Sequence, residues 1–374
     1  MIKNHKKIRV GITHGDINGI GYEVIMKVAS DTRLCELCTP VFYGSAKVAG
    51  YYRKALNMQA LPFHQIKHIG QAKDGMFNVV NVIEEETKVE PGQSTKIAGE
   101  ASFAALEAAT LDLREGDIDV LVTAPINKHN IQSQTFTFPG HTEYLEASLG
   151  NGEKAMMILC NERMRVALVT THLPITKIAG AITKDLVLER LETFDRSLRR
   201  DFGVQNPRIA VLALNPHAGE QGLIGKEEEE EIIPAINEAY DKRILCFGPY
   251  AADGFFGSGN YEHFDGILAM YHDQGLAPFK ALSMETGVNF TAGLPFVRTS
   301  PDHGTGYDIA GKGVADESSM RQAIYTAIDV FNNRIAYDEA RRNPLRKQYF
   351  DKGNDNVVLD LTKSDDDDIP VSVD

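Results

Sequence analysis

The sequence is poor in positive charge, and this limits the partners that the protein can have. Lysine and arginine total 39 residues against 52 aspartates and glutamates, which gives a formal net charge of −13. A surface that binds nucleic acid needs an excess of basic side chains, so we expect no nucleic-acid partner. Part of the negative charge lies in the run Asp365–Asp368, and we expect about the last ten residues to be disordered.

Cysteines and long apolar segments are also scarce. Four cysteines in 374 residues exclude a fold that depends on disulfides. Cys35 and Cys38 have C-x-x-C spacing, but no second pair or neighbouring histidine completes a zinc site, so their role stays open. No apolar stretch has the form of a signal peptide or is long enough to cross a bilayer. These absences favour a cytoplasmic protein with no membrane partner.

What the sequence does contain is an alternation of short apolar strands with helical stretches. Residues 8–12 and 119–123 are predicted strands. Residues 94–114 form a predicted helix with Ser94 or Thr95 as its N-cap and Gly116 at its end, and residues 184–202 form an amphipathic helix. This alternation predicts an α/β fold with a largely parallel sheet, and the length is sufficient for two domains.

Three local predictions concern the C-terminal half. The glutamate run 227–231 is predicted to form the solvated first turn of a helix that reaches Tyr240. Pro278 is predicted to prevent a continuous helix between His272 and Lys280. Two closing helices are predicted near residues 317–332 and 337–347.

Three predicted strands each lead into a histidine one to three residues beyond their ends. These histidines are His172, His217 and His272. Ligands of parallel sheets bind beyond the carboxyl ends of strands, so we expect the three side chains to meet at one edge. A lone histidine in a loop is more often a hydrogen-bonded structural residue, but three at equivalent positions favour a metal. Three imidazoles favour Zn²⁺, Co²⁺ or Ni²⁺ over Mg²⁺, and three protein ligands leave a coordination position open for catalysis.

Two further groups of polar residues suggest a binding site for an anion. His141 and Thr142 begin a predicted helix after Pro139-Gly140, where backbone N–H groups attract anions; the alternative is an ordinary N-cap by Thr142. Lys280, Asn289 and Arg298 lie on successive short segments and offer donors for a phosphate or carboxylate. The alternative is that these three are unrelated polar residues scattered over the surface.

The segment 302–313 combines four glycines with two acids and a histidine. Such a loop can wrap a nucleotide through its backbone while an acid binds ribose hydroxyls, although by composition alone it could be a surface loop. The glycine-containing loop 14–21 lies between a strand and a helix but lacks G-x-G-x-x-G spacing.

Taken together, six motifs resemble the 4-hydroxythreonine-4-phosphate dehydrogenase family of vitamin B6 biosynthesis, over about residues 8 to 330. They are Gly15-Asp16 with Gly19-Ile-Gly21, Thr123–Lys128, Pro139–Glu143, Asn215–Glu220, Ala269–Gly275 and Gly293–Ser300. The loop 303–313 is also similar to the cofactor loop of isocitrate and isopropylmalate dehydrogenases. The resemblance implies a two-domain α/β/α fold of that kind, with residues 1–128 and 290–374 in one domain and 129–289 in the other. It also implies a homodimer whose active site is shared between subunits.

The resemblance also implies the chemistry. Family members oxidise the 3-hydroxyl of 4-phosphooxy-L-threonine with NAD or NADP, and the product loses CO₂ to give 3-amino-2-oxopropyl phosphate. It assigns one divalent metal (Zn, Co or Mg) to the three histidines. It assigns the phosphorylated substrate to His141, Thr142, Lys280, Asn289 and Arg298. It places the cofactor at His303, Gly304, Thr305 and Asp308.

The catalytic base is left open between Lys128, Asp253 and Asp273, and the two aspartates could instead orient or join the metal ligands. The sequence departs from the family pattern at Ala252–Gly254 and at Met284–Gly287, close to substrate positions. A dehydrogenase of a phosphorylated four-carbon sugar acid, such as threonate or erythronate 4-phosphate, is therefore an alternative. A metal-dependent ligand-binding protein without turnover is a second one.

Overall fold

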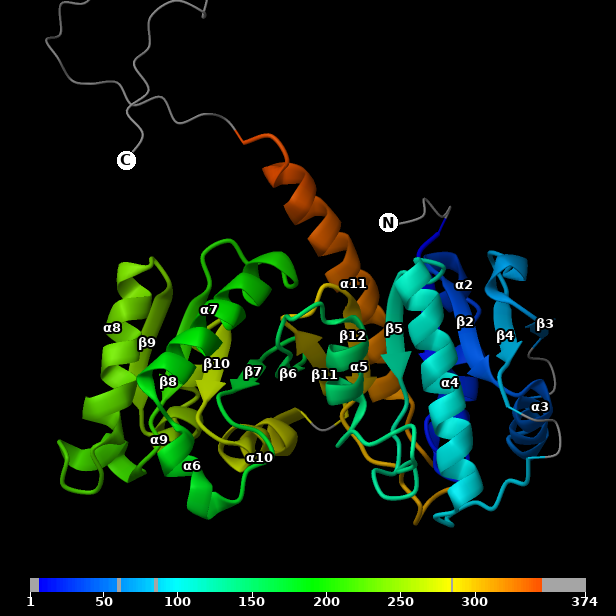
Figure 1. Ribbon diagram of the computed structural model, residues 1–374, viewed down its shortest axis with the longest axis horizontal. Helices are drawn as coiled ribbons and strands as arrows, with labels where there is room; N and C mark the ends of the chain where they lie inside the picture. Colours follow the sequence, from blue (N-terminus) through cyan, green and yellow to red (C-terminus); the bar gives the residue numbers. More distant parts are fainter. Residues whose placement is uncertain (1–6, 59–61, 84–86, 284, 345–374) are drawn as a thin grey trace, which may run out of the picture.

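A twelve-stranded sheet runs through the whole molecule (Figure 1). The structure is a computed structural model that describes residues 7–58, 62–83, 87–283 and 285–344. The strands are β1 (Arg9–Thr13), β2 (Thr39–Gly44), β3 (Phe63–Ile66), β4 (Phe77–Asn81), β5 (Val120–Thr123), β6 (Met156–Cys160), β7 (Arg165–Leu168), β8 (Arg208–Leu212), β9 (Leu245–Tyr250), β10 (Gly266–Ala269), β11 (Val288–Ala292) and β12 (Val297–Pro301).

Helices cover both faces of this sheet. They are α1 (Gly21–Ala29), α2 (Leu34–Leu37), α3 (Ala46–Ala55), α4 (Lys96–Glu115), α5 (His141–Leu149), α6 (Ile175–Ala181), α7 (Lys184–Arg200), α8 (Ile233–Asp241), α9 (Ala252–Gly257), α10 (His272–Ser283) and α11 (Ser318–Arg341). Short 3₁₀ segments lie at Ile69–Gln71, Pro216–Glu220 and Asn260–His263, and a π-helical turn lies at Glu228–Ile232. Among the described residues, no helix is long and apolar enough to span a bilayer.

The predicted α/β fold with a largely parallel sheet is confirmed. The strand order is β3-β4-β2-β1-β5-β12-β11-β6-β7-β10-β8-β9, and antiparallel pairing is confined to the junctions β12–β11, β11–β6 and β6–β7. The strands of residues 1–128, together with β12, occupy one half of the sheet, and β6 to β10 occupy the other. The domain boundaries themselves stay a prediction.

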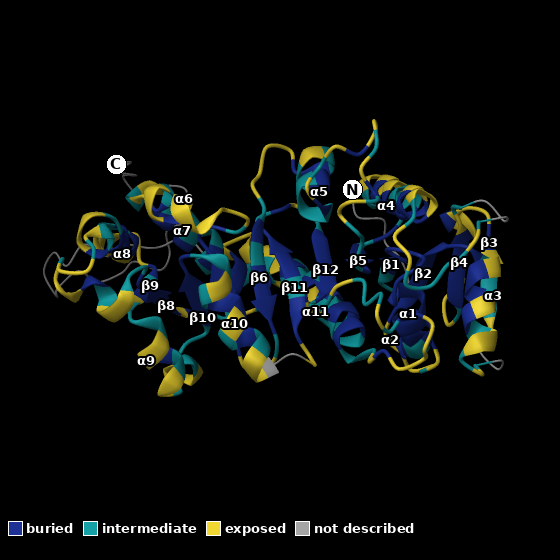
Figure 2. Ribbon diagram, turned by 90° about the horizontal axis from the view of Figure 1, so that it is seen from below, coloured by how far each residue is buried: buried dark blue, intermediate teal, exposed yellow. Residues whose placement is uncertain are grey.

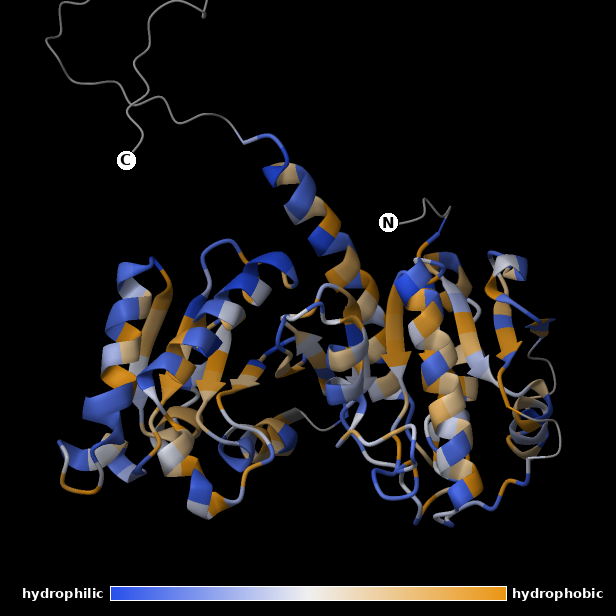
Figure 3. Ribbon diagram, viewed as in Figure 1, coloured by the Kyte–Doolittle hydropathy of each residue, from blue (hydrophilic) through white to orange (hydrophobic). Residues whose placement is uncertain are grey.

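Alternate residues of each strand enter different cores, as the twofold repeat of a strand requires. In β5, Val122 packs into the large cluster that lines one face of the sheet, whereas Leu121 packs on the other face with residues of α4 and α5. In β10, Leu268 joins the first cluster and Ile267 packs with α9 and α10. Figure 2 shows the buried strands between helices whose outer surfaces are exposed, and Figure 3 shows the apolar residues concentrated in the strands.

The two helices predicted from caps and periodicity are confirmed. Thr95 caps α4 by accepting a hydrogen bond from the backbone N–H of Ala98, and Gly116 follows in the left-handed conformation (φ 71°) that lets a helix end without a steric penalty. Helix α7 buries the predicted apolar face, including Leu191 and Phe194.

Two helix predictions were wrong. Helix α10 continues through Pro278, because a proline removes a single helical hydrogen bond while Leu276 and Phe279 on either side are buried in the core. Helix α11 is one helix where two were predicted, and Arg334 in its last third is held by an ion pair with Asp201 (2.7 Å). Residues 345–347 of the second predicted helix and the acidic run 365–368 lie outside the described residues.

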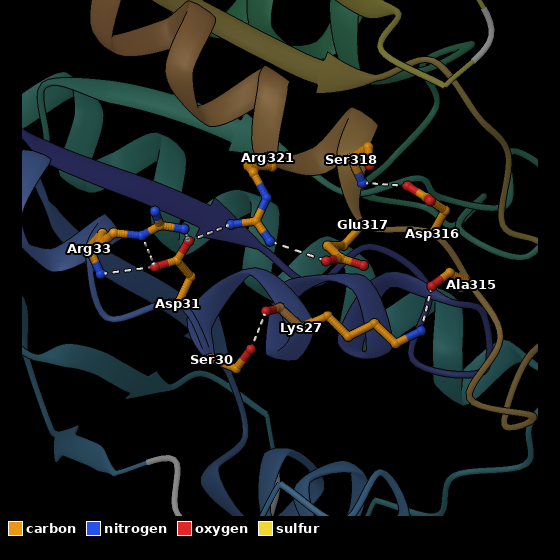
Figure 4. Close-up of polar contacts among 9 residues, drawn as sticks. All are labelled: Lys27, Ser30, Asp31, Arg33, Ala315, Asp316, Glu317, Ser318 and Arg321. Carbon is orange, nitrogen blue, oxygen red and sulfur yellow. Dashed lines mark hydrogen bonds and ion pairs between the residues drawn. The ribbon is translucent and has the colours of Figure 1, made fainter.

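The start of α11 is fastened to the end of α1, although the two are almost 300 residues apart in sequence. Figure 4 shows Arg321 between Asp31 and Glu317, at 3.2 and 3.1 Å. In the same view, the Lys27 ammonium donates to the carbonyl oxygen of Ala315. These contacts hold the segment that follows the predicted cofactor loop.

His14, directly after β1, is buried and stacks on Tyr22 with ring centroids 5.2 Å apart. Burial lowers the pKa of His14 from 6.5 to about 4, and the backbone of Gly15 and Ala101 opposes this shift only in part. Between these two pH values the unfolded chain therefore binds more protons than the folded protein. The contribution of His14 to the free energy of unfolding is therefore present in full well above pH 6.5 and is lost as the pH falls toward 4.

We predict that His14→Gln reduces the acid sensitivity of the fold. Through this single group, the wild type should lose about 1.6 kcal/mol of unfolding free energy between pH 6.5 and 5. Urea denaturation of both proteins at the two pH values measures the difference, and the remaining histidines contribute equally to both. An equal loss in wild type and variant would contradict the assignment to His14.

Candidate functional site

The three histidines follow three adjacent parallel strands. In the sheet, β10 lies between β7 and β8 and pairs in parallel with both. His172 lies beyond β7, His272 begins α10 directly beyond β10, and His217 lies in the 3₁₀ segment beyond β8. Figure 1 shows the arrowheads of β5, β8 and β10 on the same lower side of the sheet, so the segments after these strands share one edge.

Within one chain, two of the three histidines come together. The rings of His172 and His272 have centroids 6.1 Å apart. In the part of the chain that the structure describes, no three His, Cys, Asp or Glu side chains form a group that could hold a metal, so His217 does not complete the pair. Asp273 Oδ1 lies 2.7 Å from His272 Nδ1, which fixes the ring and leaves Nε2 as the nitrogen able to bind a cation.

The loop that carries His217 has an unusual backbone. Residues 217 to 221 all have positive φ, including the non-glycine residues His217 (53°), Ala218 (53°) and Gln221 (55°). Such conformations cost energy in L-residues and persist only where the surroundings impose them, often at functional sites.

Glu228 supplies part of that constraint. Its side chain is buried, and Oε1 accepts hydrogen bonds from the backbone N–H groups of Leu214 (2.8 Å) and Asn215 (2.7 Å). Oε2 accepts from Asn215 Nδ2 at 2.9 Å. The prediction that the glutamate run is simply a solvated first turn is therefore wrong for Glu228, which fixes the chain just before His217. The run also begins as a π-helical turn, with α8 starting only at Ile233.

A buried arginine lies at the centre of the predicted anion site. Arg298 Nε and one terminal nitrogen donate to Thr123 Oγ1 (3.1 and 2.6 Å), and the other terminal nitrogen donates to Thr291 Oγ1 (3.2 Å). A guanidinium has five N–H donors, so two remain for a ligand once these three bonds are counted. Burial lowers the pKa of Arg298 to about 10, with Glu143 opposing, so the group stays cationic at neutral pH. Asn289 lies two residues before Thr291 on β11 and therefore on the same face of the sheet.

His141 faces the same cation. Burial, Arg298 and Lys128 all lower the pKa of His141 well below 6.5, so its imidazole is neutral. Its Nε2 is buried and has no hydrogen-bond partner among the described residues. Gly140 is the N-cap of α5, which excludes the alternative that Thr142 caps this helix. A neutral imidazole, a helix N-terminus and an arginine together form a site for an anion.

Lys128 connects this anion site to the histidine pair. It is exposed on the loop after β5, and its Cε lies 3.6 Å from the place where a Cβ at Gly140 would be. Its charge lowers the pKa of both His141 and His172, although burial is the larger cause in each case. Asp253 is exposed on α9 beyond the edge strand β9, and within the described residues it forms no hydrogen bond or ion pair with the three histidines.

Lys280 is held by Asp302, one of the two acids of the segment 302–313, to which the sequence analysis assigned no individual role. Lys280 Nζ lies 3.0 Å from Asp302 Oδ1. Burial raises the pKa of Asp302 and Lys280 opposes it, while Oδ2 is buried without a hydrogen-bond partner in the described part of the chain. Burial also lowers the pKa of the neighbouring His303. The free Oδ2 marks a place where a ligand or water can donate a hydrogen bond.

The predicted cofactor loop lies against the loop after β1. The N–H of Ile20 donates to the carbonyl oxygen of Thr305 at 2.9 Å, and a Cβ at Gly19 would lie only 2.6 Å from that oxygen. Gly304 and Asp308 are exposed on the loop. The close approach explains the need for glycine at position 19, because any side chain there would separate the two loops.

Cys35 and Cys38 are both free thiols in and after the short helix α2. In the described structure neither belongs to a cluster of potential metal ligands. Asp302 was predicted only as one of two acids in the segment 302–313, and Glu228 only as part of a solvated run, because an acidic residue carries no pattern that reveals its burial. A position directly after a strand was the one available signal for Asp302, which follows β12.

The model of the pyridoxal phosphate biosynthetic protein PdxA family matches residues 36–327. The chain belongs to the PdxA family. It is 62% identical over 361 residues to the 4-hydroxythreonine-4-phosphate dehydrogenase of Bacteroides thetaiotaomicron, a match that covers 96% of this chain and 99% of that protein. The expected family is thereby confirmed.

Two further matches define the breadth of this family. The chain is 38% identical over 330 residues to the D-threonate 4-phosphate dehydrogenase of Cupriavidus necator, covering 87% of this chain and 98% of that one. It superposes on the crystal structure of the 4-hydroxythreonine-4-phosphate dehydrogenase of Klebsiella pneumoniae with a TM-score of 0.75 and 34% identity, covering 88% and 99% of the two chains.

We predict that Glu228→Gln destabilises the protein by about 1–3 kcal/mol, because an amide NH₂ would replace an acceptor and face donors at a buried site. Glu230→Gln, two residues further on at an exposed position, is the matched control and should change stability by less than about 0.5 kcal/mol. Urea denaturation of the three proteins measures both values. Equal stability of the two variants would show that Glu228 does not hold the His217 loop.

Proposed function

We propose that this member of the PdxA family oxidises 4-phosphooxy-L-threonine at its 3-hydroxyl with NAD or NADP, and that the product loses CO₂ to give 3-amino-2-oxopropyl phosphate. The observation that carries the proposal is the position of Lys128, whose Cε lies 3.6 Å from the place of a Cβ at Gly140, next to His141, and whose charge also lowers the pKa of His172. A substrate that carries a phosphate at one end and an oxidisable hydroxyl a few bonds away fits such an arrangement. The dehydrogenase names of the relatives support the same reaction class.

The phosphate would be bound by the predicted substrate residues. Arg298 has N–H groups to spare, neutral His141 can donate one hydrogen bond, and the N-terminus of α5 adds the Thr142 backbone. Lys280 and Asn289 would contact the remaining polar groups. Asp302 keeps Lys280 in place and prevents the long side chain from turning into solvent.

A divalent cation would be held by His172, His272 and, from a second copy of the chain, His217. One chain supplies a pair of imidazoles, so a homodimer with a shared site accounts for the missing third ligand. Asp273 would keep His272 in the orientation that presents Nε2. When bound, such an ion supplies Lewis-acid chemistry, which lowers the pKa of an alcohol and stabilises negative charge on oxygen.

The loop that contains His303, Gly304, Thr305 and Asp308 would hold the nicotinamide cofactor, which when bound would supply a hydride acceptor. The exposed carboxylate of Asp308 can accept hydrogen bonds from ribose hydroxyls and would repel a 2′-phosphate, which favours NAD over NADP. Of the three candidate bases, Lys128 is the one beside both halves of the site, and it would take the proton of the substrate hydroxyl. Asp273 is engaged by His272, and Asp253 lies apart.

The second candidate substrate is a phosphorylated four-carbon sugar acid. D-threonate 4-phosphate carries the same phosphate and hydroxyl but has a hydroxyl in place of the amino group, and relatives of 38% and 39% identity are named for it. The higher identity of the Bacteroides protein, at 62%, favours the amino acid. A ligand-binding protein without turnover is disfavoured by these dehydrogenase relatives. We also propose that the protein is located in the cytoplasm.

We predict NAD reduction with 4-phosphooxy-L-threonine at a kcat/KM at least about tenfold above that with D-threonate or D-erythronate 4-phosphate. Absorbance at the NADH maximum measures all three. Activity should disappear after exhaustive chelation and return with Zn²⁺ or Co²⁺. A preference for threonate phosphate would reassign the substrate, and activity that survives chelation would remove the metal.

We predict that Arg298→Lys raises KM for the phosphorylated substrate by roughly tenfold or more, because a lysine cannot keep the bonds to Thr123 and still present two donors. The KM for NAD should stay within about twofold of the wild-type value. Arg163→Lys, at an exposed position between β6 and β7, is the control. An unchanged substrate KM in the Arg298 variant would exclude the phosphate from this site.

A further inference from the structure

A hydrogen bond between the half-buried Tyr307 and the buried Asp16 joins three loops that surround the proposed site. Tyr307, in the proposed cofactor loop, donates its hydroxyl hydrogen to Asp16 Oδ2 at 2.7 Å. Asp16 lies in the loop after β1 and is fully buried. The two residues are 291 positions apart in the sequence.

The third loop is the one that carries Lys128. Asn130 Nδ2 donates to the same Asp16 Oδ2 at 2.8 Å, and Asn127 Nδ2 donates to the Tyr307 hydroxyl oxygen at 3.0 Å. Asn127 Oδ1 in turn accepts the backbone N–H of His129 at 2.8 Å. Lys128 therefore sits in a turn whose first residue is bonded to the proposed cofactor loop.

Both oxygens of the Asp16 carboxylate accept hydrogen bonds in this arrangement. Its Oδ1 accepts the backbone N–H of Asn18 at 2.8 Å, which shapes its own loop. Burial and the bond to Asp16 raise the pKa of Tyr307 to about 12, so its hydroxyl remains a donor at any assay pH. A hydrogen bond to a buried charged acceptor is stronger than one between neutral groups.

Backbone contacts hold the same loop from its other sides. A Cβ at Gly92 would lie 2.9 Å from the Tyr307 carbonyl oxygen, and Gly92 has a positive φ of 79°. At the far end of the loop, Lys27 donates to the carbonyl oxygens of Gly313 and Ala315 (Figure 4 shows the second contact). Lys27 thus holds the C-terminal end of the loop, and the Tyr307 hydroxyl fixes the middle of the loop to Asp16 and Asn127.

We infer that Tyr307 is a positioning residue: its hydroxyl, bound between Asp16 and Asn127, sets the cofactor loop at a fixed distance from the turn that carries Lys128. The inference rests on the proposed function, because it assumes that the loop 303–313 binds the nicotinamide cofactor. It assigns a role to two residues that touch neither substrate nor metal. Loss of the hydroxyl should weaken cofactor binding without affecting the Arg298–His141 site.

Binding of NADH to the full-length protein, measured by fluorescence titration, tests the inference without any turnover. We expect Tyr307→Phe to raise the Kd by about tenfold, since it removes one hydrogen bond to a charged acceptor. Asp16→Asn should raise the Kd for NADH by a similar factor. The Kd of the double variant should not exceed the larger of the two single-variant values, because both changes break the same contact. Tyr325→Phe, at a half-buried position on α11, is the control and should leave the Kd within about twofold.

Steady-state kinetics provide the second readout. In Tyr307→Phe the KM for NAD should rise by about the same factor as the Kd, while the KM for the phosphorylated substrate stays within about twofold. A folded Tyr307→Phe protein with wild-type NADH affinity would overturn the inference, as would additive effects in the double variant. A wild type that binds NADH but turns over no phosphorylated substrate would instead count against the proposed function.

Discussion

The constraint on which the site depends is the parallel pairing of buried strands. A strand that is buried on both faces can present polar side chains only beyond its end, and parallel neighbours bring those ends to one edge. β10 lies between β7 and β8, so the residues that follow all three emerge together. The register of the sheet thus decides that His172 and His272 meet, while the strained turn beyond β8 decides where His217 points.

Around that edge the protein buries polar groups that would be costly elsewhere. Arg298 keeps its charge inside the sheet because two threonine hydroxyls accept its N–H groups, and His141 is kept neutral. Glu228 is buried because it accepts three donors at the start of the His217 loop. Asp302 has one oxygen paired with Lys280, and its other oxygen is buried without a hydrogen-bond partner among the described residues. Buried polar groups of this kind lower stability and are concentrated at functional sites.

Local sequence reasoning succeeded where local physics decides the outcome. The capping of α4 by Thr95 and the end of that helix at Gly116 follow from the preferences of single residues. It failed where packing overrides those preferences, as in the passage of α10 through Pro278 and in the burial of Glu228. A proline costs one hydrogen bond and a carboxylate needs donors, and only the surrounding core shows whether either condition is met.

The amino-acid sequence was enough to predict the α/β class, the family and the histidines that follow three strands, because periodicity and motif spacing are properties of the chain. The fold, in contrast, set which of those side chains meet, since the strands of the sheet do not follow one another in sequence order. It alone joined Asp16 to Tyr307 and Lys280 to Asp302, and it separated His217 from its two counterparts within one chain. Contacts between residues far apart in the sequence depend on how distant strands are arranged in the sheet, and no local pattern records that arrangement.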